Sequence, residues 1–348
     1  MLNKLIIKNL KCLADEGLLL KPLTILTGAN SSGKSTVIQA LMLLIGHSQE
    51  VNIFKMEELL LHLDNFTAIR NKTTNAKEIY IEVISTDGQN HRLELTDNSA
   101  ETDSSLQYYF EAKESQQELL YLNANRVGAE DLTAVSQQRK VGEYAQYLFS
   151  HFERIKGKSL PDYLVKYEGS NTLGYQLSQW LTEITGSEME LKTELVGDRV
   201  KVFYSANDIG SEISPFNLGA GVSYIAKVLI ICLMAKQGDL VLIENPEIHL
   251  HPKSQALIGA FLSFIASKGI QLIVETHSEH LINRIRLEAS NENISSDDVV
   301  VHYKPSSETH FQTLLLDAFG HFCDQDEVRQ SFPTGFFDAS VDTLLSLR

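Results

Sequence analysis

The sequence has little of three things that mark common protein classes. It has only three cysteines, Cys12, Cys232 and Cys323, so no disulfide framework is expected and a reducing cytoplasm suits it. No apolar run approaches the roughly 20 residues of a membrane-spanning helix, and the first residues alternate like a strand, unlike a signal peptide. The formal net charge of −15 excludes a globally basic nucleic-acid binder. We therefore expect a cytoplasmic protein without a membrane partner, in which a DNA contact needs a local basic patch or a second protein.

A glycine-rich stretch near the N-terminus carries the strongest motif. Residues 28–35 read GANSSGKS, which fits the G-x-x-x-x-G-K-[ST] pattern of a phosphate-binding loop. An apolar run over 23–27 precedes it and a helix-forming stretch over 36–44 follows, so we expect strand, loop and helix in that order. Lys34 is then expected to neutralise the β- and γ-phosphates, and the Ser35 hydroxyl to bind Mg²⁺. The alternative is a turn rich in glycine and serine before an ordinary core helix.

Two later strands are expected to end beside the same nucleotide. Residues 239–243 form a buried-type strand that leads into Glu244, where a P-loop ATPase keeps the acid that holds Mg²⁺. A second strand, within GIQLIVETHSEHL, delivers Thr276 and His277 at its end. Ligands of open parallel sheets bind at the carboxyl ends of the strands, so these side chains can converge.

A second anion-binding helix start is predicted in the middle of the chain. Gly219, Ala220 and Gly221 directly precede an apolar helical stretch, and the N-H groups of such a helix start attract phosphate. One nucleotide needs only one such helix start, so the second requires an explanation.

The chain has 348 residues, 43% of them hydrophobic, which is enough to form the core of one large domain or of two. Alternating patterns predict its remaining strands. Two strands are expected within residues 1–27, turning near Glu16 and Gly17, and hairpins over 78–96 and 189–205.

Between these hairpins the pattern changes. Residues 97–118 are polar and predict an exposed loop or a poorly ordered insertion. A strand returns over 119–128, and the helical spacing of residues 131–183 predicts an inserted helical lobe.

The motifs in this order resemble the ABC-type ATPases of the RecF, SMC and OLD (overcoming lysogenization defect) group. More closely, the chain resembles stand-alone bacterial AAA-family ATPases that end in a short C-terminal region, matched here by FPTGFFDAS. The resemblance implies an α/β P-loop NTPase fold, with an ABC-ATPase-like mixed sheet, an antiparallel β part and the inserted helical lobe. It divides the chain into an N-terminal ATPase part (1–130), the lobe and hairpin (131–205), a C-terminal ATPase part (206–305) and a C-terminal cap (306–348).

The resemblance also implies a head-to-tail homodimer, in which each ATP is held by the P-loop of one chain and the signature of the other. This explains the second helix start. Lys34, Ser35 and Thr36 match the Walker A group, residues 219–222 the signature, Glu244 the Walker B acid, residues 249–251 the D-loop and His277 the switch histidine. Arg126 matches a characteristic arginine to which the sequence assigns no role.

These correspondences give the expected site residues. The expected ATP contacts are Gly28, Asn30, Ser31, Ser32, Gly33, Lys34, Ser35, Thr36, Gly219, Ala220, Gly221 and Asn245. The expected ligands of Mg²⁺ are Ser35 and Glu244, and the expected catalytic residues are Lys34, Glu244, Glu247 and His277.

Two departures from the wider ABC pattern predict slow hydrolysis. The signature reads LGAG over 218–221 and lacks the usual serine, so only N-H groups and the helix dipole remain to meet phosphate. Asn245 stands where most ABC ATPases place the glutamate that activates water, and an amide cannot take the proton. Glu247 is the nearest replacement. Slow turnover suits a switch better than a motor.

Two other functions compete with this interpretation. One is a metalloenzyme, with zinc held by some of Glu247, His249, His251, His277 and His280, although no HExxH or cysteine pair accompanies them. The other is the ABC module of a membrane transporter, which the helical lobe and the long distance from Lys34 to Gly219 disfavour.

The favoured function is a switch in antiphage defence or DNA repair that acts on a separate effector protein, a nuclease or a toxin. The dimer is one expected assembly, and a higher oligomer is the alternative. OLD nucleases carry a Toprim domain after the ATPase. Only 62 residues follow Arg286 here, without an evident cluster of acids, so no nuclease is expected in this chain.

Overall fold

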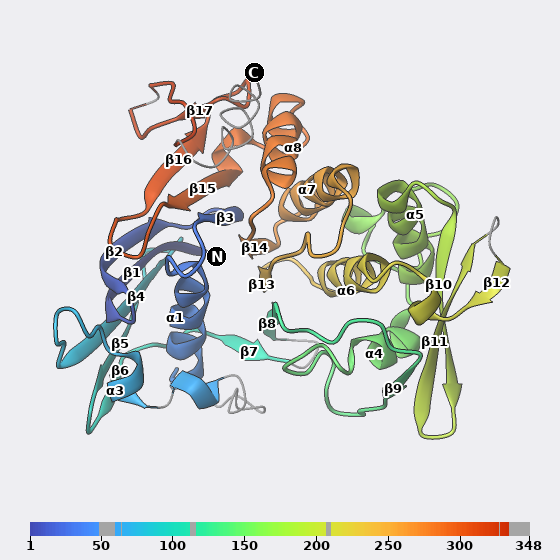
Figure 1. Ribbon diagram of the computed structural model, residues 1–348, viewed down its shortest axis with the longest axis horizontal. Coiled ribbons are helices and arrows are strands. Elements are labelled where there is room, and N and C mark those ends of the chain that lie inside the picture. Colours follow the sequence, from blue (N-terminus) through green and yellow to red (C-terminus); the bar gives the residue numbers. More distant parts are fainter. Residues whose placement is uncertain (49–59, 64, 112–115, 207–209, 327, 334–348) are drawn as a thin grey trace, which may run out of the picture.

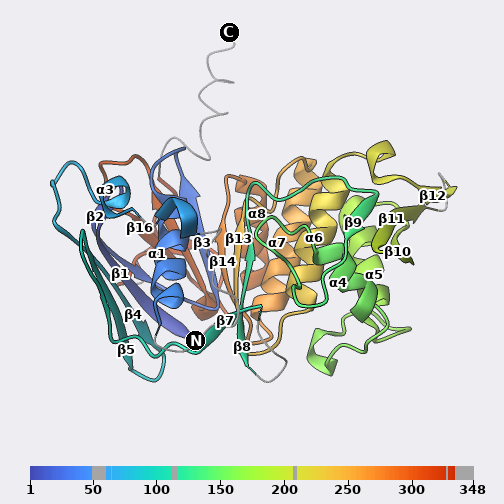
Figure 2. The same cartoon turned by 90° about the horizontal axis from the view of Figure 1, so that it is seen from below.

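Five layers make up the molecule. The structure is a computed structural model that describes residues 1–48, 60–63, 65–111, 116–206, 210–326 and 328–333. Figure 1 shows, from left to right, an antiparallel sheet, helix α1 (Lys34–Gly46), a larger sheet, a layer of helices and a third sheet. Figure 2 shows the same order from below. The predicted α/β architecture with an antiparallel part is confirmed.

The central sheet has eight strands and carries the predicted nucleotide-binding edge. Its order is β17-β16-β15-β3-β14-β13-β8-β7, and the six strands from β15 to β7 run parallel. In chain order the strands are β3 (Leu23–Gly28), β7 (Tyr108–Phe110), β8 (Gln117–Leu122), β13 (Leu240–Glu244), β14 (Gln271–Glu275), β15 (Val299–Lys304), β16 (Gln312–Leu316) and β17 (Phe322–Cys323). The strand that leads into the P-loop therefore lies beside β14, and β14 lies beside β13, as the convergence of the motifs required.

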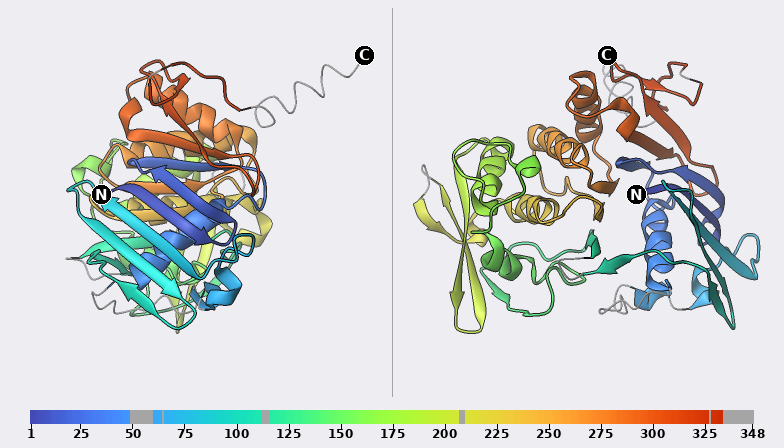
Figure 3. Two further views of the ribbon diagram at one scale, coloured as in Figure 1. Left: turned by 90° about the vertical axis from the view of Figure 1, so that its left-hand side faces the viewer. Right: turned by 180° about the vertical axis from the view of Figure 1, so that it is seen from behind.

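The antiparallel sheet covers the outer side of α1, and the left view of Figure 3 shows its face. Its order is β2-β1-β4-β5-β6, with β1 (Leu2–Leu10), β2 (Leu13–Leu19), β4 (Glu78–Ser85), β5 (Asn90–Thr96) and β6 (Ala100–Thr102). The expected turn near Glu16 and Gly17 is wrong. The chain turns at Lys11, whose φ of 51° permits a tight turn, so residues 13–19 form an additional strand that pairs with β1.

One apolar cluster lies on each face of the central sheet. Helix α1 packs in the cluster between the two sheets. Helices α4 (Leu148–Ile155), α5 (Leu173–Thr185), α6 (Gly221–Leu233), α7 (Pro252–Ala266) and α8 (Glu279–Ser290) contribute to the cluster on the opposite face. The short helix α3 (Phe66–Ile69) comes directly before β4 of the antiparallel sheet in the chain. Each parallel strand is consequently buried on both faces, which explains its continuous apolar sequence.

The third sheet lies beyond the helices. It contains the predicted hairpin of β10 (Met189–Val196) and β11 (Arg199–Ala206), with β12 (Gly210–Ile213) and β9 (Leu132–Ala134) paired to β11. Within residues 131–183, α4 and α5 are the α-helices, and a short 3₁₀ helix (Asp162–Leu164) with irregular chain on both sides connects them. Helix α5 packs against α6 and α7, so the predicted lobe shares the core of the ATPase part.

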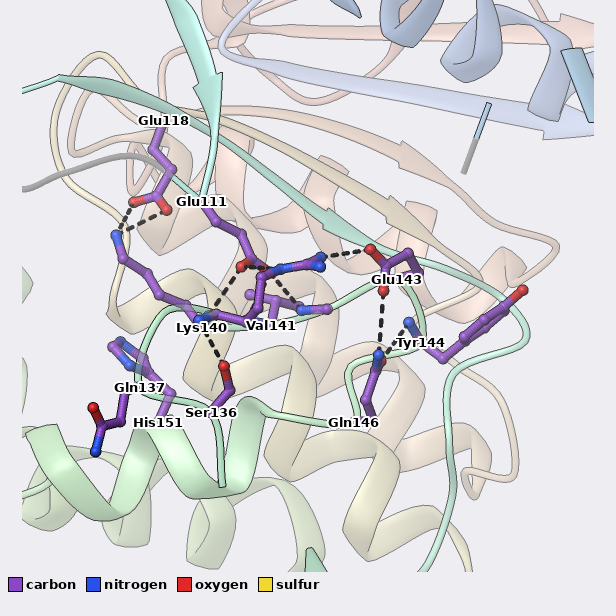
Figure 4. Close-up of polar contacts among 12 residues, drawn as sticks. Glu111, Glu118, Ser136, Gln137, Lys140, Val141, Glu143, Tyr144, Gln146 and His151 are labelled. Atoms are coloured by element: carbon purple, nitrogen blue, oxygen red, sulfur yellow. Dashed lines mark hydrogen bonds and ion pairs between the residues drawn. The ribbon is translucent and has the colours of Figure 1, made fainter. Parts of the chain in front are cut away.

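The expected exposed loop over residues 97–118 is wrong in part. Strand β6 extends the antiparallel sheet and β7 forms an edge of the central sheet. Glu111, after β7, accepts hydrogen bonds from the N-H groups of Val141 (3.1 Å) and Gly142 (2.5 Å) and from Arg139 Nε (2.6 Å). Figure 4 shows this carboxylate among its donors, beside the ion pair of Lys140 with Glu118. The buried carboxylate of Glu111 thus holds in place a segment whose polar composition predicts exposure to solvent.

Two further expectations concern the ends and the surface. FPTGFFDAS begins at Phe332, and all but its first two residues lie outside the described residues. No helix in the part of the chain that the structure describes is long and apolar enough to cross a membrane.

Candidate functional site

The P-loop has the backbone that a phosphate needs. Gly28 and Gly33 have φ of 132° and 113°, and a Cβ at these positions would lie 2.1 Å from the Lys304 carbonyl oxygen and 2.7 Å from Cys12 Sγ. Ser31 also has a left-handed φ of 58°. Only glycine fits the first two positions. The loop therefore curls tightly between strand and helix, in the conformation that turns N-H groups toward an anion.

Side chains of the loop complete this concave surface. Lys34 is 3% exposed, and its Nζ donates to the carbonyl oxygens of Gly28 (3.2 Å) and Ala29 (2.7 Å). Burial lowers the pKa of Lys34, while Glu275 and Glu247 act to raise it. Ser32 Oγ is buried without a hydrogen-bond partner. Thr36 is buried, and Asn30 and Ser31 are exposed. This arrangement fits a nucleotide phosphate that would draw Lys34 Nζ off the carbonyls and give Ser32 a partner.

The alternation of side chains along β13 and β14 places two glutamates on the side of the central sheet that faces α1. Leu240 and Leu242 of β13 pack on the α1 side, so Glu244 follows on that side. Ile273 of β14 packs there too, so Glu275 does the same, and the two glutamates are register partners. Sequence reasoning missed Glu275. The acid at the end of the buried run QLIVE was the signal that could have found it.

The two glutamates have different partners. Glu275 Oε2 accepts a hydrogen bond from the Ser35 hydroxyl (2.7 Å), and Glu275 Oε1 lies 3.9 Å from Lys34 Nζ. Glu244 instead accepts from the Tyr121 hydroxyl (3.0 Å) and the Ala124 N-H (3.1 Å). Burial raises the pKa of both carboxyl groups. The acid in contact with the Walker A residues is therefore Glu275, and Glu244 lies beside it.

The structure also gives Arg126 a place. Its guanidinium donates to the carbonyl oxygens of Glu244 (2.8 Å) and Asn245 (2.9 Å), and lies 5.0 Å from the ring centre of Tyr224 on α6. Burial lowers its pKa to about 10, which leaves it charged at neutral pH. Arg126 thus joins the end of β13 to the helix that follows the signature.

The turn after β13 holds the other predicted groups. Asn245 has a left-handed φ of 45°, and its side-chain oxygen is buried without a partner. Glu247 Oε1 accepts from the His277 N-H (2.7 Å), and its Oε2 is buried and unpartnered. Burial raises the pKa of Glu247, and burial together with Lys34 lowers the pKa of His277. Asn245 and Glu247 thus lie on the P-loop side of the site, and their side-chain oxygens can accept hydrogen bonds from a ligand.

The signature residues begin α6 on the other face of the central sheet, because α6 and α1 belong to different apolar clusters (Figure 1). Gly219 and Ala220 are exposed, and a Cβ at Gly219 would meet nothing within 4 Å. Gly221 is buried, and a Cβ there would lie 2.6 Å from the His249 carbonyl oxygen. The signature therefore presents an open helix start that packs on the D-loop segment.

The histidines of the metal alternative have other partners. His249 packs its ring 5.2 Å from that of Tyr224, His251 Nδ1 accepts from the Lys253 N-H at the start of α7, and His280 lies 4.0 Å from Glu279. Among the described residues, no three His, Cys, Asp or Glu side chains are grouped to hold a metal ion. The spatial grouping that a zinc site needs is thus not formed by the described residues.

Two cavities differ in whether motif residues line them. A cavity of about 310 Å³ lies at the P-loop, and Lys11, Lys34, Ser35 and Glu275 are among its lining residues. A larger one of about 740 Å³ lies between α5 and β10, remote from every motif. The smaller cavity is the candidate site because the motif residues line it.

Comparisons with known proteins agree with this geometry. A family model described as "AAA domain, putative AbiEii toxin, Type IV TA system" matches residues 23–283, about three quarters of the chain. The chain belongs to this AAA-domain family. An OLD nuclease of Thermus scotoductus is 25% identical over 353 residues, covering 87% of this chain and 64% of that protein. The AAA-domain chain therefore spans less than two thirds of the length of this relative.

Solved structures share the fold. An Smc head bound to the C-winged helix domain of ScpA has a TM-score of 0.51 and 11% identity, covering 91% of this AAA-domain chain and 98% of that one. An Smc head with an extended coiled coil, bound to the C-terminal domain of ScpA derived from Pyrococcus furiosus, gives 0.52 and 11%, covering 90% and 96%. The resemblance to P-loop ATPases of the OLD- and SMC-like group, with an ABC-type fold, is confirmed.

Proposed function

We propose that this chain binds ATP with Mg²⁺ and hydrolyses it slowly, and that two copies close on the nucleotides to form a dimeric switch. The observation that carries the proposal is the P-loop, in which Lys34 and Ser35 lie against a buried acid at the carboxyl edge of a parallel sheet. The N-H groups of the loop and Lys34 would bind the phosphates, and Ser35 with the neighbouring acids would hold Mg²⁺, which neutralises charge on the phosphates.

The slow rate follows from the groups around Asn245. Glu247 has a buried oxygen that can polarise a water molecule, and His277, whose pKa is lowered by burial and by the Lys34 charge, lies on the P-loop side of the site. We propose these two as catalytic, with Lys34 and Glu244, while Asn245 orients the water without taking its proton.

Dimer closure rests on the second helix start. Gly219 and Ala220 of the signature turn (residues 219–221) are exposed, and the turn lies on the opposite sheet face from α1, so it can meet the nucleotide of another copy. Its N-H groups and helix dipole suit a γ-phosphate.

The biological setting is proposed from the comparisons. The family description refers to a toxin–antitoxin system, and one relative is named a nuclease and is longer than this chain. From these names we propose a role in antiphage defence or DNA repair, in which the switch controls a separate nuclease or toxin.

The Lys34→Ala variant tests the nucleotide site. It should weaken binding of a fluorescent ATP analogue about 100-fold, because contacts of a charged group with phosphate contribute about 1.5 to 3 kcal/mol each. Lys192→Ala, on β10 in the third sheet, removes the same charge elsewhere and should bind like wild type. Equal affinities of Lys34→Ala and wild type would remove ATP binding from the P-loop and end the proposal.

A further inference from the structure

The Mg²⁺ site of the resemblance relies on Glu244, yet in the structure both oxygens of Glu244 already have donors. Oε1 accepts from the Tyr121 hydroxyl and Oε2 from the Ala124 N-H, and both donors belong to β8 or the turn after it. These bonds tie the end of β13 to β8. They give Glu244 a structural task that is independent of any nucleotide.

Glu275 has the opposite set of contacts. It is 5% exposed, and its donors come from the start of α1, where Ser35 donates its hydroxyl proton at 2.7 Å and Lys34 lies 3.9 Å away. An ionised carboxylate can only accept, so the Ser35 proton points at Glu275. The lone pairs of Ser35 Oγ are then turned away from Glu275 and are available to a cation.

The backbone fixes this geometry. The Asn245 N-H donates to the Glu275 carbonyl oxygen (2.8 Å), and the Thr276 N-H donates to the Leu26 carbonyl oxygen (3.0 Å). The end of β14 is therefore held to β13 on one side and to the strand that enters the P-loop on the other. Glu275 cannot leave Ser35 without a rotamer change in a buried position.

The charges around Glu275 call for a cation. Glu244 and Glu275 are register partners on neighbouring parallel strands, which lie about 4.8 Å apart. Lys34 lies 3.9 Å from Glu275, and Arg126 is the cation that interacts with Glu244 and Glu247. Three carboxylates with two cations leave an excess negative charge, which is costly in a low-dielectric site. A divalent cation beside Ser35 balances it.

We propose that Glu275 is the positioning residue for the Mg²⁺ of a bound nucleotide. It holds the Ser35 hydroxyl so that the oxygen lone pairs face the cation, and Glu244 chiefly anchors β13. The inference rests on the proposed function, because it concerns the cation that accompanies ATP. It assigns to a residue of β14 the task that the motif pattern assigns to β13.

The test measures the affinity of a fluorescent ATP analogue in EDTA and in saturating MgCl₂, and takes the ratio as the Mg²⁺ enhancement. Glu275→Gln should bind the analogue in EDTA at least as well as wild type, because the loop and Lys34 are intact. Its Mg²⁺ enhancement should fall about tenfold or more, as loss of partners behind metal ligands commonly does. The matched control, Glu244→Gln, should lose less.

A double-mutant cycle tests the route through Ser35. If Glu275 acts by holding this hydroxyl, Ser35→Ala should lower the enhancement, and adding Glu275→Gln should lower it little further. Glu275→Asp, which keeps the charge on a shorter side chain, should lie between wild type and Glu275→Gln. A contact that only stabilises the fold would shift the melting temperature and leave the enhancement unchanged.

The outcomes separate this inference from the proposed function. A wild-type enhancement in Glu275→Gln, or additive effects in the cycle, overturns the inference while ATP binding stands. If wild-type protein and Lys34→Ala bind the ATP analogue with equal affinity, the proposed function is overturned instead. Should Gln at 275 prevent folding, Glu275→Asp decides, because an enhancement equal to that of wild type would exclude the positioning role.

Discussion

The P-loop and the signature turn are both helix starts that suit an anion, but they are built differently. The P-loop lines a cavity, and its Lys34, Ser32 and Thr36 are buried. The signature turn is exposed at Gly219 and Ala220, although both α1 and α6 begin without a side-chain cap. The first is complete within one chain, whereas the second offers only N-H groups and a helix dipole. This difference supports the proposed dimer, in which the signature turn of one chain meets a phosphate that the second chain presents.

The largest expected effect comes from a charge placed on the signature turn. Gly219→Asp should abolish dimer closure with Mg²⁺ and a slowly hydrolysed ATP analogue, because its carboxylate would repel the γ-phosphate. Binding of the analogue to the monomer should be unchanged. Light scattering and the fluorescence titration measure the two quantities.

The structure guides the choice of position and control for this test. Gly221 is unsuitable, since a Cβ there would collide with the His249 carbonyl oxygen. Gly219 has no such neighbour, and Gly157 shares its open surroundings and lacks a left-handed φ, so Gly157→Asp is the matched control. Closure of Gly219→Asp at the same analogue concentration as Gly157→Asp would contradict the dimer.

The second effect concerns the core behind the P-loop. His302 of β15 is fully buried beside β3, where its Nε2 donates to the Leu19 carbonyl oxygen and its Nδ1 accepts from the Thr313 hydroxyl. Burial lowers its pKa to about 4. The unfolded chain therefore binds a proton more readily, so this contribution to stability is complete above pH 6.5 and is lost as the pH falls toward 4.

The loss from His302 should reach about 3 kcal/mol of unfolding free energy. Urea denaturation of wild type and His302→Gln between pH 7 and 4 measures it. Other groups, such as His151 with a pKa lowered to about 3, titrate in both proteins, so the difference isolates His302. Parallel curves for the two proteins would show that His302 does not couple this core to pH.

The comparison also explains what the sequence could predict. The P-loop, its strand and α1 are consecutive, so their pattern was sufficient, and the hairpins of β4 with β5 and β10 with β11 follow from local alternation and turns. Glu275 could not be assigned in the same way. Its partner Ser35 is 240 residues away, and only the strand order β3-β14-β13 brings the two together.

Polar composition misled the prediction for the same reason. Residues 97–118 read as an exposed loop because charges are frequent there, yet Glu111 is buried by donors near Arg139 to Gly142. A carboxylate with four such hydrogen bonds can be buried at acceptable cost, but its donors lie about 30 residues downstream. Sequence patterns contain no sign of that pairing.

The third effect concerns the missing base on the P-loop side. Asn245→Glu should raise the single-turnover rate of ATP hydrolysis about tenfold or more over Asn245→Gln, because only the carboxylate can take a proton from water. Both variants bear the same cost of a left-handed backbone at position 245, so the pair isolates the charge. Equal rates in two folded, ATP-binding variants would place this side chain outside the reaction.

The smallest effect should appear where the two helix starts are joined. Arg126 holds the carbonyl oxygens after β13 and lies over the ring of Tyr224, which also contacts His249. A cation over an aromatic ring contributes about 1 kcal/mol at a partly exposed site. Removing the ring in Tyr224→Leu should leave nucleotide binding to the monomer unchanged and raise the analogue concentration for half-maximal dimer closure about fivefold. Tyr224→Phe keeps the ring and should close like wild type. If Tyr224→Leu weakened monomer binding and closure equally, Arg126 would only support the P-loop side, and the two helix starts would be independent of each other within one chain.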